Sequence, residues 1–308
     1  MKLTEILGSN NIDLVLVDTS IESSHDFTWG IYECRGGYRN LDKKQLEKEA
    51  EIISNLKSVL EHSKSHTISA VTKELRVFEQ IINTKMRYLS HGPLPKKKKT
   101  RTEIKRRNAE SQIVLRLLQD ELYRTRRMSY AKELKIEDKN YNLLLDMIKL
   151  IEPIIKIKKD LSFVLGVHNE DRARDSDTDE RLTAALYWLS LFSDKSSCLI
   201  TGDRDFVGLS GIITRLIGSD SFLPHNEFFR KRIIENPFKI YKRFNGEFNL
   251  SRDSSLINYD NKFLIRRSSK EINESTKDNI TRMWKNFNPA IETTSISPYP
   301  VQRVSSYS

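Results

Sequence analysis

The sequence predicts an α/β protein with a three-layer arrangement, in which helices flank a parallel sheet that carries a helical insertion. Short apolar, β-branched runs such as 12–17 and 197–200 alternate with longer stretches whose apolar residues recur at helical spacing. A basic stretch of helical pattern, 93–160, interrupts that alternation. We therefore expect one domain over 1–250, with 93–160 as its insertion, followed by a polar extension over 251–308.

The N-terminal part reads as strand, helix, strand, helix. Residues 12–17 form a short apolar run that predicts a buried parallel strand, and Asp18 follows it directly. Residues 41–62 carry an apolar stripe typical of an amphipathic helix. Residues 66–71 predict a second strand, and the spacing of apolar residues predicts a helix over 72–87.

The expected insertion starts after Gly92-Pro-Leu-Pro95, which should end the preceding helix. Apolar stripes predict a long helix over 104–122 and a second over 141–158, which we expect to form an antiparallel pair. The insertion begins with a dense set of cations: Lys96, Lys97, Lys98, Lys99, Arg101, Lys105, Arg106 and Arg107. Such a charge excess favours contact with nucleic-acid phosphates.

The second half returns to the α/β pattern. Residues 161–167 predict a strand, 181–191 a helix, 197–200 a buried strand and 205–217 a further helix. Residues 238–250 predict a hairpin on an Asn-Gly turn. Within the polar extension we expect one weakly helical patch over 280–287 and a disordered end over 293–308.

Composition limits the partners. The formal charge of +10 and the pI near 9.4 favour a polyanionic partner. No apolar run approaches the length of a membrane span, so we expect no membrane association. Cys34 and Cys198 are far apart and lie in no metal-ligand spacing, which suits a reducing cytoplasm. Oligomeric state and any protein partner stay open.

Carboxylates stand beside the predicted strand ends at four places. Asp18 follows the first strand, and Glu74 lies in the first turn of the helix after the second. Asp179 opens a helix, and Asp203 follows the last core strand. Because the carboxyl ends of parallel strands share one edge, these four acids are expected to converge. Carboxylates of this kind bind Mg²⁺ or Mn²⁺, which activates water and stabilises charge during attack on a phosphodiester.

Four segments, in this order, resemble the motifs of the PIN-domain family of metal-dependent nucleases. They are Val17-Asp-Thr-Ser20, Thr67-Ile-Ser-Ala-Val-Thr-Lys-Glu-Leu75, Asp179-Glu-Arg-Leu-Thr-Ala-Ala185 and Thr201-Gly-Asp-Arg-Asp-Phe206. The resemblance covers 12–87 and 161–217. The long basic insertion departs from compact members of the family.

The resemblance implies a set of catalytic residues that bind one or two ions: Asp18, Glu74, Asp179 and Asp203. It adds Asp205 as an auxiliary ligand or water-orienting group, while Asp177 stays an alternative to Asp179. The implied activity is hydrolysis of RNA by a PIN-type endoribonuclease, and the preference for RNA rests on family analogy. A structure-selective DNA nuclease and a catalytically inactive RNA-binding module are the alternatives.

Overall fold

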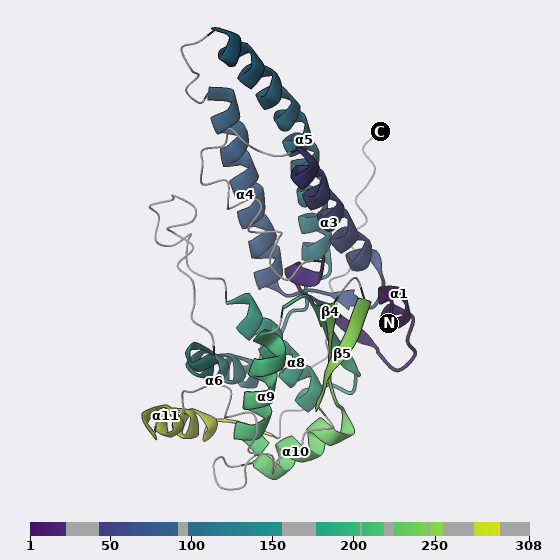
Figure 1. Ribbon diagram of the computed structural model, residues 1–308. Coiled ribbons are helices and arrows are strands. Elements are labelled where there is room, and N and C mark those ends of the chain that lie inside the picture. The colour runs from purple at the N-terminus through teal and green to yellow at the C-terminus, as the bar shows by residue number, and fades with distance from the viewer. Residues whose placement is uncertain are drawn as a thin grey trace.

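A five-stranded sheet lies at the centre of the molecule (Figure 1). The computed structural model describes residues 1–22, 43–91, 98–155, 177–203, 205–218, 225–244, 247–254 and 274–289. The strands are β1 (Leu14–Val17), β2 (Ser65–His66), β3 (Ser197–Thr201), β4 (Lys239–Phe244) and β5 (Glu247–Asp253). Their order is β2-β1-β3-β4-β5, with β1 to β4 parallel and β5 antiparallel to β4.

Helices flank this sheet, which confirms a mixed α/β architecture. They are α1 (Leu3–Leu7), the 3₁₀ helix η1 (Thr19–Glu22), α3 (Lys43–Glu61), α4 (Ser69–His91), α5 (Lys98–Ala131), α6 (Lys139–Ile155), α8 (Thr178–Phe192), α9 (Asp205–Gly218), α10 (Asn226–Glu235) and α11 (Glu274–Trp284). The predicted strand 161–167 and the end 293–308 lie outside the described residues. No helix in the described part of the chain is long and apolar enough to cross a membrane.

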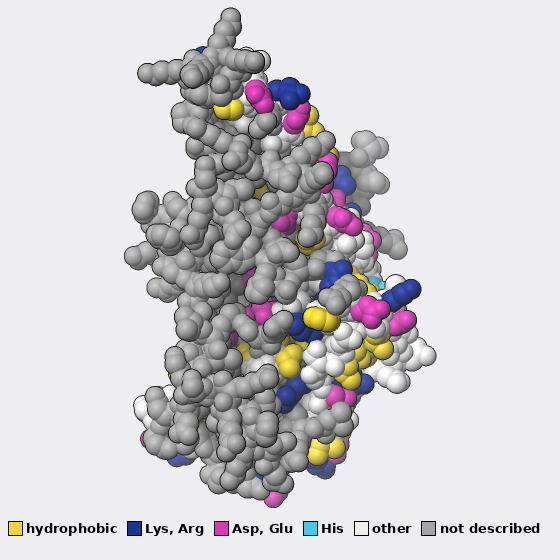
Figure 2. All heavy atoms as spheres, viewed as in Figure 1, with side chains coloured by type: hydrophobic (Ala, Val, Ile, Leu, Met, Phe, Trp, Pro, Cys, Tyr) yellow, Lys and Arg dark blue, Asp and Glu magenta, His cyan; other side chains and the backbone are white. Residues whose placement is uncertain are grey.

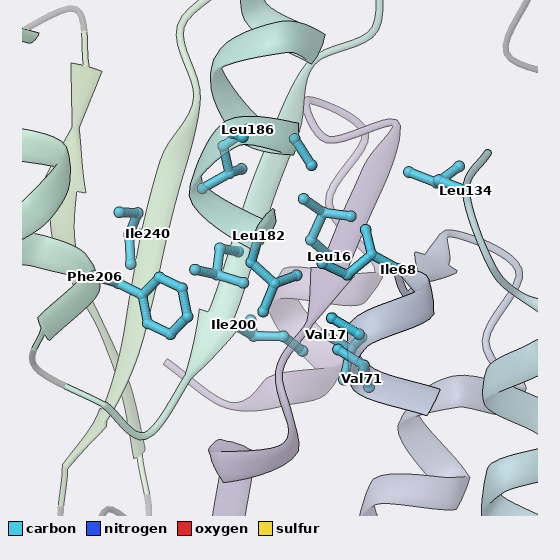
Figure 3. Packing of buried hydrophobic residues seen from close by; sticks show 14 of the residues in the cluster. Leu16, Val17, Ile68, Val71, Leu134, Leu182, Leu186, Ile200, Phe206 and Ile240 are labelled. Carbon is cyan, nitrogen blue, oxygen red and sulfur yellow. The ribbon is translucent and has the colours of Figure 1, made fainter. Parts of the chain in front are cut away.

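The core forms where β1 and β3 lie under α8. Every residue of both strands is buried, as expected of central parallel strands. Figure 3 shows Leu182 and Leu186 of α8 between Leu16 of β1 and Ile240 of β4, and all four belong to one apolar cluster. The helix is joined to β3 by a short connection, so α8 runs back along the sheet and begins at the carboxyl ends of the strands.

The second predicted strand, 66–71, is wrong in extent. Only Ser65 and His66 pair with β1, and Ser69 already begins α4. Thr67 leaves the ladder because its backbone instead bonds the chain after α5: its N–H donates to Lys132 O at 3.0 Å, and its carbonyl accepts from Leu134 N at 2.8 Å. Of the apolar residues that suggested a strand, Ile68 is buried directly before α4, and Ala70 and Val71 are buried in its first turn.

Helices α3, α4 and α5 pack together into an arm that projects from the sheet (Figure 1). The Thr72 and Ser129 hydroxyls lie 2.8 Å apart at its base. Farther along the same helix pair, Gln119 donates to Asn83 at 2.6 Å, and Gln112 donates to Ser90 at 2.9 Å. These pairs align α4 and α5 antiparallel over their length.

The predicted antiparallel pairing between α5 and α6 is therefore wrong, although both helices form. Helix α6 packs instead on α8, α9 and α11. Both segments are amphipathic helices, as predicted. Amphipathic spacing predicts which face of a helix is buried, but not which other element covers that face. The part of 93–160 that the structure describes contributes one helix to the arm and one to the body.

The polar extension also contains a packed element. Asn140 at the start of α6 donates to Asn288 O at 2.8 Å and accepts from Asn288 N at 3.1 Å. Trp284 stacks on Phe287 with ring centroids 4.3 Å apart, and both side chains are buried. The predicted helical patch is thus an anchored part of the body, and β5 extends to Asp253, past the expected boundary at 250.

Candidate metal centre

Asp18 stands at the carboxyl edge of the sheet, directly after β1. Val17 is in register with Ile200 of β3, and Asp18 N donates to Ile200 O at 3.3 Å. This register sets Asp18 level with Thr201, the last residue of β3. The topology thus brings together two segments far apart in sequence.

Hydroxyl groups surround the Asp18 carboxylate. Thr201 Oγ1 donates to Asp18 Oδ2 at 2.7 Å, and Ser20 Oγ donates to the same oxygen. The Ser20 and Thr201 hydroxyl oxygens lie 3.1 Å apart, and Gly202 N donates to Ser20 Oγ at 3.3 Å. This network fixes the carboxylate in one orientation.

Asp18 is only 4 % exposed, and its environment opposes its charge. Burial raises the pKa of Asp18, the Ser20 and Thr201 hydrogen bonds partly offset that rise, and the charge of Asp203 adds to it. Asp18 and Asp203 are therefore close enough to interact electrostatically. A hard cation between them would reverse this unfavourable balance.

Glu74 is joined to Asp18 through a shared hydroxyl. Thr19 Oγ1 donates to Glu74 Oε2 at 2.8 Å and lies 3.5 Å from Asp18 Oδ1. Glu74 stands in the second turn of α4, because that helix begins at Ser69, earlier than expected. The structure thus brings Glu74 to the same edge.

Asp203 follows β3, and its N–H donates to Thr201 Oγ1 at 2.9 Å. Thr201 therefore bonds to Asp18 with its proton and to the Asp203 backbone with its lone pair, which ties the two acidic segments together. Asp205 begins α9, as predicted, and its side chain lies outside the described atoms.

Asp179 and Asp177 have different surroundings at the start of α8. Asp177 is paired with Lys149 Nζ at 2.9 Å and with Arg181 Nε at 2.8 Å. Burial raises the pKa of Asp177, but the bonds and charges of Arg181 and Lys149 outweigh it and bring the pKa to about 2. Asp179 lies in the first turn of α8, which begins at the carboxyl ends of the strands, and is partly buried. The hydroxyl network described above around Asp18 does not include Asp179.

Within the described side chains, no three His, Cys, Asp or Glu groups are gathered as a ready-made metal site. Asp18, Glu74 and Asp203 share an edge through hydroxyl groups. The sequence did not predict that Ser20 bonds to Asp18. Its position two residues after an Asp at the end of a strand could have indicated it. Glu49 of α3 and Glu180 of α8 are two further buried carboxylates that the sequence did not single out, and both have interaction partners.

The predicted nucleic-acid-binding cations fall at the far end of the arm. Arg101, Lys105 and Arg106 are exposed on the first part of α5. Lys96 and Lys97 lie outside the described residues, as do the side chains of Lys98, Lys99 and Arg107. Figure 2 shows Lys and Arg side chains near the tip of the arm with Asp and Glu side chains beside them.

These cations are remote from the carboxyl edge. The pairing of Arg126 with Glu79 at 2.9 Å and of Thr72 with Ser129 places Met128 about level with Glu74. Arg106 is therefore about 30 Å, and Arg101 about 40 Å, farther along the helix axis, at 1.5 Å per residue. Side chains at that distance cannot contact a group bound at Asp18.

The part of α5 nearest the sheet also carries exposed cations and aromatic rings. Arg124 and Arg127 are exposed, and the guanidinium of Arg127 lies 5.9 Å from the centre of the Tyr123 ring. Tyr130, the residue before the last one of the helix, is also exposed. Arginine next to an aromatic ring is a surface suited to a nucleic-acid strand.

Comparison of the chain with protein-family models, with curated proteins and with solved structures gave no match.

Proposed function

We propose that this protein is a PIN-like, metal-dependent endoribonuclease that hydrolyses RNA phosphodiester bonds at the carboxyl edge of its sheet. The observation that carries the proposal is the buried Asp18, held by Ser20 and Thr201 and facing the charge of Asp203. A buried acid whose charged form is disfavoured and whose orientation is fixed is typical of a functional site. The four motif resemblances support the family, and the preference for RNA rests on that analogy.

The described acidic and hydroxyl groups beside Asp18 fit Mg²⁺ or Mn²⁺, because they offer oxygen ligands: carboxylates from Asp18 and Asp203, with the Ser20 and Thr201 hydroxyls beside them. Asp18, Asp203 and Asp179 would hold the ion, with Asp205 as an auxiliary ligand. When bound, the ion supplies an activated water and stabilises charge on the phosphate.

The protein's own groups divide the remaining work. Ser20 and Thr201 orient the Asp18 carboxylate, since both donate to its Oδ2. Thr19 donates to Glu74 Oε2 at 2.8 Å and so orients that carboxylate at the edge, where Glu74 would position the attacking water and accept its proton. Exclusion of water around the 4 % exposed Asp18 strengthens these interactions.

The arm would provide affinity rather than chemistry. Arg101, Lys105 and Arg106 are exposed cations that attract phosphates and draw RNA towards a negatively charged edge that would otherwise repel it. An RNA that contacts both regions must extend across roughly 30–40 Å.

Cleavage of labelled single-stranded RNA in Mn²⁺ tests the function. Wild-type protein should cut, and Asp18→Asn and Asp203→Asn should not. Asp13→Asn is the matched control, because Asp13 stands at the opposite end of β1 and bonds Ser196. Cleavage that survives both edge substitutions would contradict the proposal. Binding without cleavage by the wild type would favour the inactive module, and preferential cleavage of the DNA counterpart would favour the DNA nuclease.

A further inference from the structure

A cation stands in the same row as the buried carboxylate. Strand β4 is parallel to β3, and Thr201 is in register with Lys242. Asp18 is level with Thr201 on the other side. Asp18, Thr201 and Lys242 therefore occupy neighbouring positions at the carboxyl ends of three adjacent parallel strands.

The three residues also share a face of the sheet. Directly registered residues of parallel strands point to the same side, and Leu16, Leu199 and Ile240 are the row that precedes them by two residues. Figure 3 shows Leu16 and Ile240 on the side covered by Leu182 of α8. The row of Asp18 thus continues that face towards the first turn of α8.

Strand spacing sets the gap between the acid and the cation. Adjacent strands lie about 4.8 Å apart, so the Cα atoms of Asp18 and Lys242 are roughly 10 Å apart. Thr201 stands between them and turns its hydroxyl towards Asp18. A phosphate bound near Asp18 at the carboxyl end of this row would lie within reach of the long Lys242 side chain.

The opposite end of β4 provides a comparison. Lys239 is partly buried like Lys242, but it pairs with Cys198 near the start of β3, so it lies towards the amino ends of the strands. Arg243 follows Lys242 and, by strand alternation, points to the other face; burial lowers its pKa. Lys242 is the β4 cation in the row of Asp18.

We propose that Lys242 is a catalytic residue that binds a non-bridging oxygen of the scissile phosphate beside the Asp18 centre. This inference rests on the proposed nuclease function. The ammonium stabilises the negative charge that builds on the phosphate during attack by water, a contribution that is greater in the transition state than in the bound substrate. It also allows a polyanion to approach an edge that already carries Asp18 and Asp203.

The test measures kcat and KM for RNA cleavage in Mn²⁺ with Lys242→Met, Lys242→Gln and Lys242→Arg. Lys242→Met keeps the length and apolar character of the stem while it removes the charge. We expect kcat to fall by about a hundredfold in the Met and Gln variants, with a smaller change in KM. Lys242→Arg should recover most of the loss, because it restores the charge. Lys239→Met, on the same strand at the other edge, should behave as wild type.

Melting temperature and Mn²⁺ affinity separate catalysis from structure. Both should be unchanged in Lys242→Gln if Lys242 acts on the phosphate. Wild-type kcat in Lys242→Met or Lys242→Gln, or equal losses in Lys242→Arg and Lys242→Gln, would overturn the assignment and leave the nuclease function standing. A wild-type protein that cuts no RNA in Mn²⁺ would instead overturn the proposed function itself, and the role of Lys242 with it.

Discussion

The carboxyl edge and the helical arm differ in charge and in burial. At the edge, the buried Asp18 accepts bonds from two hydroxyls on a rigid sheet. On the arm, Arg101 and Lys105 are exposed on a helix whose inner face packs against α3 and α4. About 30 Å or more separates the two regions. Under the proposed function, reaction chemistry would reside at the edge and substrate capture on the arm, so substitutions in one region should leave the other region's contribution unchanged.

The largest expected effect is that of removing an edge carboxylate, which should lower the rate of cleavage and leave RNA affinity unchanged. Under the proposed function, Asp18→Asn removes a metal ligand, and the lost charge stabilisation of several kcal/mol should lower kcat by about a thousandfold. RNA affinity in EDTA should stay near the wild-type value, because the arm is untouched. Single-turnover cleavage and filter binding measure the two effects. An equal loss of binding would mean that the edge also captures the substrate.

Removing the tip cations should have the converse effect. Arg101→Ala, Lys105→Ala and Arg106→Ala combined keep the helix, because Ala has the highest helix propensity. The slope of log K against log salt should fall by about 2 for single-stranded RNA, since three phosphate contacts are lost. The kcat for an RNA too short to span 30 Å should not change. Binding titrations over a range of salt concentrations give the slope.

The control for this variant removes the same charge from the body. Lys139, Lys231 and Lys285 are exposed on α6, on α10 and after α11. Their combined substitution by Ala should leave the salt slope near the wild-type value. A fall as large as that of the tip variant would show that net charge, and not the arm, governs RNA affinity.

The hydroxyls around Asp18 should have a smaller effect on rate and a defined effect on pH dependence. Thr201→Val keeps the shape of the side chain and removes its bond to Asp18, which should reduce kcat by roughly 10–100-fold. The Thr201 bond lowers the pKa of Asp18, so its loss raises that pKa further. The acidic limb of the pH–rate profile should therefore move to higher pH. A limb that moves to lower pH would contradict the assigned cause.

The smallest expected effect is a change in the melting temperature of Asp18→Asn when no metal is present. The folded-state pKa of Asp18 is raised above its unfolded value, so its contribution to stability is full below pH 3.8 and is lost as the pH rises through the folded pKa. At pH 7 in EDTA, Asp18→Asn should therefore melt higher than wild type, with about 2–4 °C for each kcal/mol gained. Calorimetry measures the shift. A lower melting temperature would indicate that the charged carboxylate is stabilised by the fold.

The position of Asp18 and Asp203 at one edge could be predicted from the sequence, because the order and direction of the strands determine it. Once residues 12–17 and 197–200 are read as parallel strands, Asp18 and Asp203 must leave the sheet on the same side, and in the structure the charge of Asp203 raises the pKa of Asp18. The place of Lys242 in the row of Asp18, unlike the order of the strands, depends on register. Register is a tertiary property, and no spacing within one segment reveals it.

The arm was less predictable for a related reason. The stripes of α5 and α6 were correctly identified as helical, but apolar faces are interchangeable and the partners are chosen by the assembled fold. The exposed Ile113 and Leu117, each 62 % exposed, show that an apolar residue in a helical stripe need not be buried. The predicted extent of the second strand was wrong because Thr67 bonds to a segment far along the chain.

Binding of Mn²⁺, followed by the EPR signal of the free ion, tests most directly whether the carboxyl edge holds a divalent cation. The account predicts that wild-type protein and Asp13→Asn bind Mn²⁺ alike, and that Asp18→Asn and Asp203→Asn each weaken binding at least tenfold. Unchanged binding in Asp18→Asn and Asp203→Asn, or no binding by the wild-type protein, would contradict it.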